Sequence, residues 1–382
     1  MDRRSIIATT GAVGLAGVLA ACGKKEEPVA AAPAAPAAPA APAAPAVHTG
    51  ETIRWRLASS FPKALDTIYG GAEDFAKNVS DMTGGKFQIS THAGGELMPA
   101  FGVVDGVQQG TVEVAHTAPY YFFGKSPAFA LGCAIPFGLN SRQRTAWMFQ
   151  GNGGKLMREF YDQYNMVNFP AGNTGAQMGG WYRKEIKSLA DMQGLKMRIG
   201  GFGGTIVGKI GGVPQSIPGG EIYQALEKGT IDAVEWVGPY DDQKLGFNKV
   251  APYYYYPGWW EGGPELDVLI NKDAFNKLST EYKNIVRMAA TQSHVDMQAK
   301  YDVRNPKALK ELLATGTKLR QMPKDVMDAA FKAAQTSYAE LSDTNADWKK
   351  IYADYEQFRR DQNQWHRLTE GTFDRYMQQA AL

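Results

Sequence analysis

Prolines recur at every third position between residues 33 and 45, inside a segment that otherwise consists of alanine. Proline fixes the backbone φ angle and has no amide hydrogen to donate, so this segment builds neither a helix interior nor a central strand. It is expected to form a semi-extended spacer that rises about 3 Å per residue where polyproline II holds. The repeat therefore marks residues 23–50 as an Ala/Pro-rich linker, and the globular fold is expected over residues 51–382.

The segment before the linker has the layout of an export signal. Arginines at positions 3 and 4 precede an apolar run over residues 6–20, which is too short to span a bilayer comfortably as a helix. Residues 19–22, Leu-Ala-Ala-Cys, resemble a bacterial lipobox, in which the cysteine takes a lipid. We therefore expect residues 1–22 to be a signal peptide with a lipobox, Cys22 to be lipidated, and the protein to lie in the periplasm, anchored to a membrane. The two arginines resemble a twin-arginine export signal, or they are an ordinary positive n-region.

Composition argues against a nucleic-acid partner, and the cysteine count bears on disulfides. The net charge is +2, charged residues make up 21% of the chain, and no basic patch stands out, so nucleic acid is not an expected partner. Cys22 and Cys133 are the only cysteines. If Cys22 carries a lipid, Cys133 has no intrachain partner, and its apolar neighbours predict that it packs as a small hydrophobic residue. A chain of this length can be stable outside the cytoplasm without disulfides.

After the linker, strand and helix patterns alternate. Alternating apolar residues at 53–57 and 87–89 predict strands, and spacings of three and four over 68–82 predict an amphipathic helix between them. A helix over 103–109 and a strand over 112–115 complete a β-α-β-α-β unit, which favours a mostly parallel sheet covered by helices. A second unit is expected from helices over 155–164, 205–210 and 222–227 and strands over 177–182, 195–199 and 231–237.

The last third of the chain reads as mostly helical, with large apolar residues at spacings of three and four near its end. These residues are Trp348, Ile351, Tyr355, Phe358 and Trp365. They predict one apolar helix face. This face either docks on the chain's own core or pairs two chains in a homodimer.

Motifs for catalysis are scarce. The chain has no G-x-S-x-G, H-E-x-x-H or C-x-x-C, and its five histidines have no metal-ligand spacing. Residues 203–209 match G-x-x-x-x-G-K, but Ile210 stands where a phosphate loop needs Ser or Thr to hold magnesium. The small residues are instead expected to let a helix N-terminus approach a strand or a bound anion closely.

Polar residues gather at the predicted strand ends of the second unit. Arg198 ends one strand, Glu235 and Trp236 end another, and Gln177 lies in the Gly-rich stretch 173–181. Ligands of open α/β sheets bind beyond the carboxyl ends of strands. An arginine there suits a carboxylate, and Glu and Gln oxygens suit a hard cation. The alternatives are a structural ion pair for Arg198 and a solvated carboxylate for Glu235.

At this point the sequence resembles a known family, the substrate-binding proteins of tripartite ATP-independent periplasmic transporters. The resemblance runs from Ile53 to the last helix. It rests on Phe-Pro-Lys at 61–63, Gly-Gly-Glu-Leu at 94–97, Asp-Met-Gln-Gly-Leu-Lys-Met-Arg at 191–198 and Gln-Ala-Leu-Glu-Lys-Gly-Thr-Ile-Asp-Ala at 224–233. Glu235-Trp236, the tyrosines at 253–256 and Trp-Trp-Glu at 259–261 resemble the branch that binds 2-oxoacids or 2-hydroxyacids with a metal cation.

The resemblance implies a two-lobed α/β fold of the periplasmic-binding-protein type, with a hinge and a long C-terminal helix that can exchange between protomers. The second lobe would span roughly 171–257 and the C-terminal helical part roughly 275–382. It also implies site residues. Arg198 would grip the ligand carboxylate, helped by Asn173 and Tyr121. Gln177, Glu235, the Trp236 carbonyl and Glu261 would hold a cation, sodium or calcium, that bridges to the ligand.

Two hypotheses follow from these observations. In the first, the chain is not an enzyme but a solute-binding protein that takes up a small, pyruvate-like monocarboxylate and delivers it to the membrane subunits of the transporter. In the second, it is a secreted metal-dependent enzyme acting on small carboxylic acids. The sequence offers no His or Cys motif that places a general base, and this favours the first hypothesis.

Overall fold

The computed structural model describes residues 52–380, so the predicted signal peptide with Cys22 and the whole linker 23–50 lie outside the described part. The described residues belong to one compact unit that contains two β-sheets and a large helical C-terminal part. Among these residues, no helix is both long and apolar enough to cross a membrane.

The first sheet has the strand order β2-β1-β3-β10-β4. Its strands are β1 (Ile53–Ser59), β2 (Phe87–His92), β3 (Val114–Thr117), β4 (Met166–Asn173) and β10 (Glu265–Asn271). As predicted, β1 runs parallel to both β2 and β3. The sheet as a whole is mixed rather than mostly parallel, because β10 returns from far along the chain and inserts antiparallel between β3 and β4.

The second sheet has the order β11-β9-β5-β8-β6-β7. Its strands are β5 (Trp181–Tyr182), β6 (Lys196–Arg198), β7 (Val213–Gln215), β8 (Ala233–Val234), β9 (Tyr253–Tyr256) and β11 (Lys318–Gln321). β6 lies parallel to both β7 and β8. β5 and β8 are shorter than the predicted strands over 177–182 and 231–237, because the residues beside them leave the sheet and contribute to the candidate site.

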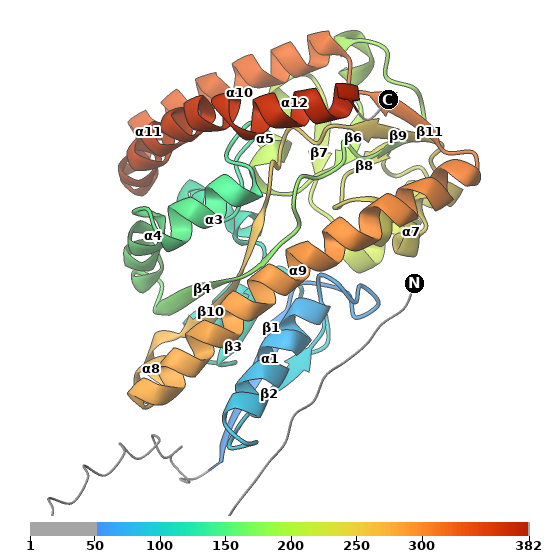
Figure 1. Cartoon of the computed structure of the whole chain (residues 1–382). Coiled ribbons are helices and arrows are strands. Elements are labelled where there is room, and N and C mark those ends of the chain that lie inside the picture. Colours follow the sequence, from blue (N-terminus) through green and yellow to red (C-terminus); the bar gives the residue numbers. More distant parts are fainter. Residues whose placement is uncertain (1–51, 381–382) are drawn as a thin grey trace, which may run out of the picture. The chain divides into compact units, whose positions relative to one another are not determined.

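Helices cover both sheets (Figure 1). The α-helices that precede β9 along the chain are α1 (Gly70–Met82), α2 (Val103–Gln108), α3 (Ser141–Phe149), α4 (Gly153–Asp162), α5 (Gly201–Lys209), α6 (Ile222–Glu227) and α7 (Pro239–Leu245). The C-terminal part contains α8 (Lys272–Asn276), α9 (Thr280–Ala314), α10 (Lys324–Thr344), α11 (Ala346–Leu368) and α12 (Glu370–Ala380). Short 3₁₀ helices include Pro119–Phe122 and Pro127–Gly132.

The 35-residue helix α9 links the two halves of the fold. It packs against α1 and β4 beside the first sheet and reaches α7 beside the second (Figure 1). At 1.5 Å per residue a helix of this length spans about 50 Å, enough to contact both lobes. The two-lobed α/β fold expected from the sequence is confirmed.

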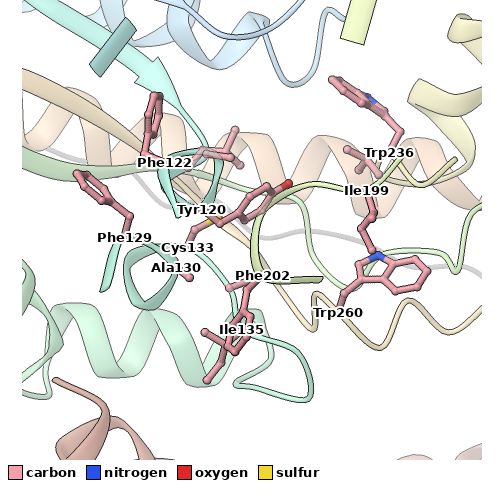
Figure 2. Close-up of a cluster of buried hydrophobic side chains, with 14 of the residues drawn as sticks. Tyr120, Phe122, Phe129, Ala130, Cys133, Ile135, Ile199, Phe202, Trp236 and Trp260 are labelled. Carbon is pink, nitrogen blue, oxygen red and sulfur yellow. The ribbon is translucent and has the colours of Figure 1, made fainter. Parts of the chain in front are cut away.

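Two hydrophobic clusters form the interior. The smaller one lies between the first sheet, α1 and α9 and includes Phe75, Phe87, Val268 and Val286. The larger one contains residues of both sheets, such as Ala115 and Trp181, and is therefore continuous from lobe to lobe. Figure 2 shows part of it, where aromatic residues of the two short 3₁₀ helices and of α5 lie near Trp236 and Trp260. Cys133 is buried there, as predicted.

The C-terminal apolar stripe splits into two parts. Trp348, Ile351 and Tyr355 are buried, and the backbone amide of Leu139 donates to the Tyr355 hydroxyl at 2.7 Å. These residues dock on the chain's own core. Trp365 at the end of α11 is 56% exposed, so the outer part of the stripe is not covered by the chain itself.

Candidate functional site

Two charged residues meet at the carboxyl ends of neighbouring strands in the second sheet. β6 ends at Arg198, β8 ends immediately before Glu235, and the parallel pairing sets Arg198 opposite Val234. The backbone amide of Glu235 donates to the carbonyl oxygen of Arg198 at 3.1 Å. The sheet register therefore places both side chains at the edge where ligands of open α/β sheets bind.

Arg198 and Glu235 form a fully buried ion pair. Arg198 Nη1 donates to Glu235 Oε1 at 2.5 Å and to the Glu235 carbonyl oxygen at 2.8 Å, and Nε donates to the Ile217 carbonyl oxygen at 3.1 Å. The guanidinium carbon lies 5.0 Å from the centre of the Trp236 ring. The structural ion pair considered for Arg198 thus exists. None of these three hydrogen bonds uses Nη2.

Glycines at the start of α5 allow this pair to lie close to the first lobe. The Gly200 amide donates to Glu235 Oε1 at 2.9 Å. A Cβ at Gly200 would lie 2.7 Å from Cε2 of Tyr120, closer than real Cβ contacts. The match to G-x-x-x-x-G-K falls within helix α5 and not in a loop, so these small residues serve close packing, as expected.

Gln177 and Glu261 lie on the two segments that connect the sheets directly. Residues 174–180 lead from β4 to β5, and residues 257–264 lead from β9 back to β10. The segments are hydrogen-bonded to each other: the Gln177 amide donates to the Glu261 carbonyl oxygen at 3.4 Å, and the Gly258 amide donates to the Gln177 carbonyl oxygen at 3.0 Å. These crossing segments are the natural place for a hinge, and both carry predicted site residues.

The two glutamates lie in an environment that disfavours negative charge. Burial raises the pKa of Glu235, and the neighbouring Arg198 offsets only part of that effect. Burial also raises the pKa of Glu261 well above its ordinary value, and the charge of Glu235 raises it further. Two nearby buried carboxyl groups are stable as anions only with additional positive charge.

Two tyrosines of the 3₁₀ helix Pro119–Phe122 complete the polar part of the site. Tyr121 lies within hydrogen-bonding reach of Arg198, and burial raises its pKa to about 12. Tyr120 lies beside Glu261, and burial raises its pKa well above the ordinary value. Both hydroxyls are therefore neutral donors at physiological pH.

A small cavity adjoins these groups between the two sheets. Its volume is about 10 Å³, room for about one water molecule, so its walls lie close together. Polar side chains on its wall are those of Tyr120, Tyr121, Thr174, Gln177 and Trp236. Apolar side chains make up the rest, and they are Phe61, Ile68, Ala118, Val237, Pro264 and Leu266. A cavity with an apolar wall and a few convergent polar groups is typical of small-molecule sites.

Asn173 is buried at the end of β4, and its amide is engaged by the main chain. Its Nδ2 donates to the Gly263 carbonyl oxygen at 3.1 Å, and its Oδ1 accepts from the Gly175 amide at 2.8 Å. These bonds tie the start of one crossing segment to the end of the other. A role in ligand binding, expected from the resemblance, would have to use the second Nδ2 hydrogen.

Three oxygen atoms of the site fit a metal cation. Within residues 52–380, Gln177 Oε1, Glu235 Oε2 and Glu261 Oε2 are buried without a hydrogen-bond donor. Hard cations such as sodium and calcium take carboxylate, amide and main-chain oxygens. In the same range no three His, Cys, Asp or Glu side chains gather as a metal site. The donor set, with two carboxylates and an amide, thus suits a hard cation better than a transition metal.

Tyr120, Phe61 and Ile68 belong to the site although the sequence reasoning did not assign them a role there. Phe61 lies within the Phe-Pro-Lys segment that carried the family resemblance, and Tyr120 is adjacent to the predicted Tyr121. Both signals were present in the sequence. Local sequence patterns did not indicate that the first lobe approaches the strand ends of the second.

Comparisons with known proteins agree with this architecture. A monocarboxylate 2-oxoacid-binding periplasmic protein of Nostoc sp. is 49% identical over 324 residues, which cover 85% of this chain and 89% of the relative. A crystal structure of a TRAP transporter solute-binding protein from Bordetella bronchiseptica is 50% identical, has a TM-score of 0.86 and covers 87% of this chain and 99% of the other. That structure is a mixed-occupancy dimer with calcium and picolinate in one active site.

A second crystal structure, of a TRAP periplasmic solute-binding protein from Pseudoalteromonas atlantica, contains bound sodium and pyruvate. It is 36% identical, has a TM-score of 0.82 and covers 85% of this chain and 98% of the other. The profile of bacterial extracellular solute-binding protein family 7 matches residues 58–345. With its fold, its site between two lobes and a family match over most of its length, this chain belongs to bacterial extracellular solute-binding protein family 7.

Proposed function

We propose that this chain binds a small 2-oxo monocarboxylate together with a metal cation in the cavity between its two sheets. The observation that carries the proposal is the meeting of a buried arginine with three buried, unpartnered oxygen atoms beside a small cavity. A carboxylate supplies the charge that Arg198 can pair with, and a cation supplies the charge that Glu235 and Glu261 need. Either charge alone would be costly to bury.

The proposed roles follow from position. The ligand carboxylate would accept hydrogen bonds from Arg198 Nη2 and from the Tyr121 hydroxyl. Gln177, Glu235, Glu261 and the Trp236 carbonyl would hold the cation, which would also contact the carboxylate and the 2-oxo oxygen of the ligand. The apolar wall formed by Ile68, Ala118 and Leu266 would face a short alkyl group. Asn173 would act on the hinge, through the main chain of both crossing segments.

The relatives support both parts of the proposal. The Nostoc protein is named for 2-oxoacid binding, and the two crystal structures combine a small monocarboxylate with calcium or with sodium. All three are binding proteins, which speaks against the secreted metal-dependent enzyme. Delivery of the acid to the membrane subunits of a tripartite transporter is the corresponding physiological role.

Calorimetry with a panel of acids tests the proposal. We expect pyruvate, other short 2-oxoacids or picolinate to bind with one-to-one stoichiometry when calcium or sodium is present, and to be recovered chemically unchanged. Saturating ligand should stabilise the folded state by about 2.7 kcal/mol at a concentration a hundred times Kd, since a ligand that binds only the native state acts by mass action. A panel without any binding, or turnover of the acid, would contradict the proposal.

We also propose that the mature protein is anchored through a lipid on Cys22 and that the Ala/Pro segment 23–50 acts as its tether. The support is the lipobox-like sequence at residues 19–22 and the proline period that follows it. A semi-extended spacer would hold the binding region away from the bilayer surface while keeping it close to the transporter.

We further propose a homodimer through the C-terminal helices. Apolar residues on the outer side of α11 and α12 are exposed, and they are Trp365, Leu368, Phe373, Tyr376 and Met377. Side chains this large gathered near one chain end are typical of an interface. A symmetric exchange of α12 would cover them in a closed contact, and the Bordetella structure is a dimer.

Removing residues 369–382 should therefore yield a stable monomer with unchanged affinity for the acid. α12 has no buried residue, and no proposed site residue lies beyond Glu261. Light scattering of the delipidated protein gives the mass, and calorimetry gives the affinity.

A cut at residue 345 is the instructive comparison. It would also remove the buried Trp348, Ile351 and Tyr355 and should destabilise the fold by several kcal/mol. A monomeric intact chain at high concentration would contradict the proposed dimer.

A further inference from the structure

A cluster of charged and polar side chains joins the two lobes next to the cavity. It consists of Asp66, Tyr240, Lys244 and Arg304, and is called the Asp66 cluster below. Asp66 forms ion pairs with Lys244 and with Arg304, the latter at 3.3 Å. The Tyr240 hydroxyl donates to Asp66 Oδ1 at 3.1 Å and lies 3.2 Å from Oδ2. The positive charges of Lys244 and Arg304 lie 4.7 and 5.0 Å from the Tyr240 ring centre.

The members of the cluster come from different lobes. Asp66 lies in the segment 60–69 between β1 and α1 of the first lobe, whereas Tyr240 and Lys244 lie on α7 of the second. Arg304 is on α9, which contacts both, and its Nη1 also donates to Thr67 Oγ1 at 2.6 Å. One carboxylate thus receives contacts from the opposite lobe and from the bridging helix.

The segment that carries Asp66 and the residues that lead into α7 both contribute side chains to the cavity wall. Phe61 and Ile68 belong to the same segment as Asp66, and Trp236 and Val237 lead directly into α7. α7 is itself fixed to α9, because the Tyr301 hydroxyl donates to Asp241 Oδ2 at 2.7 Å and the Tyr240 amide donates to Asn305 Oδ1 at 3.1 Å. A movement of segment 60–69 away from α7 would open the cavity and break the contacts of Asp66 together.

We propose that Asp66 is a positioning residue that holds the lobes closed over the ligand and thereby sets how long the ligand stays bound. The inference rests on the proposed ligand site, but Asp66 is not among the residues that line the cavity. Its side chain is 49% exposed and that of Lys244 is 32% exposed. Exposed ion pairs are individually weak, so the effect comes from several partners that share one carboxylate and are separated together on opening.

Substitution of Asp66 by Asn removes the charge and keeps the size. We expect ligand dissociation to become about three- to tenfold faster, the range for losing two or three exposed contacts, while the association rate changes little. Stopped-flow fluorescence can follow both rates, with Trp236 in the cavity wall as one reporter. Asp66→Glu should restore slow dissociation.

The matched control is Asp81→Asn. Asp81 pairs with Lys77 inside α1, so the same chemical change there breaks an exposed ion pair within one lobe. Its dissociation rate should equal that of the wild type.

Salt provides a second measurement. Choline chloride raised from about 0.1 M to about 1 M, at fixed sodium and calcium, shortens the screening length from ~10 Å to ~3 Å. Dissociation from the wild type should accelerate with salt, and dissociation from Asp66→Asn should accelerate less. Equal dissociation rates for Asp66→Asn and wild type, or equal salt responses, would overturn the positioning role of Asp66. They would not contradict the proposed ligand site.

A ligand-free measurement keeps the two proposals separable. Solution scattering of ligand-free Asp66→Asn should give a larger radius of gyration than ligand-free wild type, whatever the ligand is. If no acid binds the wild type, the proposed function fails, and the scattering comparison alone tests the role of Asp66. A larger radius of gyration for Asp66→Asn supports that role, and an identical profile overturns it.

Discussion

Replacing Arg198 by Ala should weaken binding of the acid by about 2–5 kcal/mol, the range for removing one side of a buried, hydrogen-bonded charge pair. This corresponds to a Kd that rises from about thirtyfold to more than a thousandfold. Three effects act in the same direction: the ligand carboxylate loses its partner, Glu235 loses the charge that offsets its burial, and Trp236 loses the guanidinium above its ring. Calorimetry at saturating cation measures the loss.

The Arg198 variant needs a test for folding, because Arg198 also bonds to the Ile217 carbonyl and thus supports the second lobe. Arg198→Lys keeps the charge but not the planar fork, and should retain the fold while losing most of the affinity. Arg54→Ala is the control, since Arg54 is an exposed residue of β1 bonded to Gln88. An unchanged Kd in Arg198→Lys and Arg198→Ala would exclude Arg198 as the anchor.

Removal of the cation should be nearly as damaging as removal of Arg198. In buffer that contains choline in place of sodium and a calcium chelator, we expect the Kd for the acid to rise at least about a hundredfold, or about 2.7 kcal/mol. Without a cation, the ligand carboxylate would join Glu235 and Glu261 in a buried site that holds one arginine. Titration of calcium or sodium back into the sample should restore affinity.

Glu261→Gln separates this effect from general damage. It should reduce affinity for the acid and the response to cation, yet not lower the free energy of unfolding in cation-free buffer, because it removes a carboxyl group whose pKa is raised by burial and by Glu235. Glu340→Gln, which breaks an exposed pair with Lys209, is the control. Because protons compete with the cation for carboxyl groups of raised pKa, affinity in the wild type should fall as the pH is lowered. Affinity indifferent to every cation would contradict the assignment.

Local sequence patterns predicted the elements in which the spacing of apolar residues matches their burial in the fold. The three-and-four spacing over residues 68–82 predicted α1, and α6 has the predicted bounds. Helix α3 was not predicted, because Arg142 and Arg144 interrupt its apolar pattern and Arg144 is nevertheless buried. Its capping box, in which Asn140 and Gln143 bond each other's backbone amides, was the local signal that marked its start.

Strand β10 illustrates the limit of pattern reading. Glu265 and Asp267 are fully buried in it, so a strand of the core carries two acidic residues. No local rule anticipates that, because the strand is inserted between β3 and β4 by long-range pairing. The predicted site residues at strand ends, Arg198 and Glu235, do meet, since parallel register alone brings them together. The role of Asn173 in the main chain of the crossing segments depended on contacts ninety residues away.

The hydrogen-bonded crossing segments have a consequence for how such a receptor can diversify. In our proposal Gln177 and Glu261 are cation ligands, and both lie on the hydrogen-bonded crossing segments, where the lobes would hinge. A substitution there would therefore change affinity and hinge motion together. Ile68, Ala118 and Leu266 line the cavity from outside these segments. Relatives that bind longer acids should therefore differ from this chain mainly in the apolar wall of the cavity, while the crossing segments stay the same.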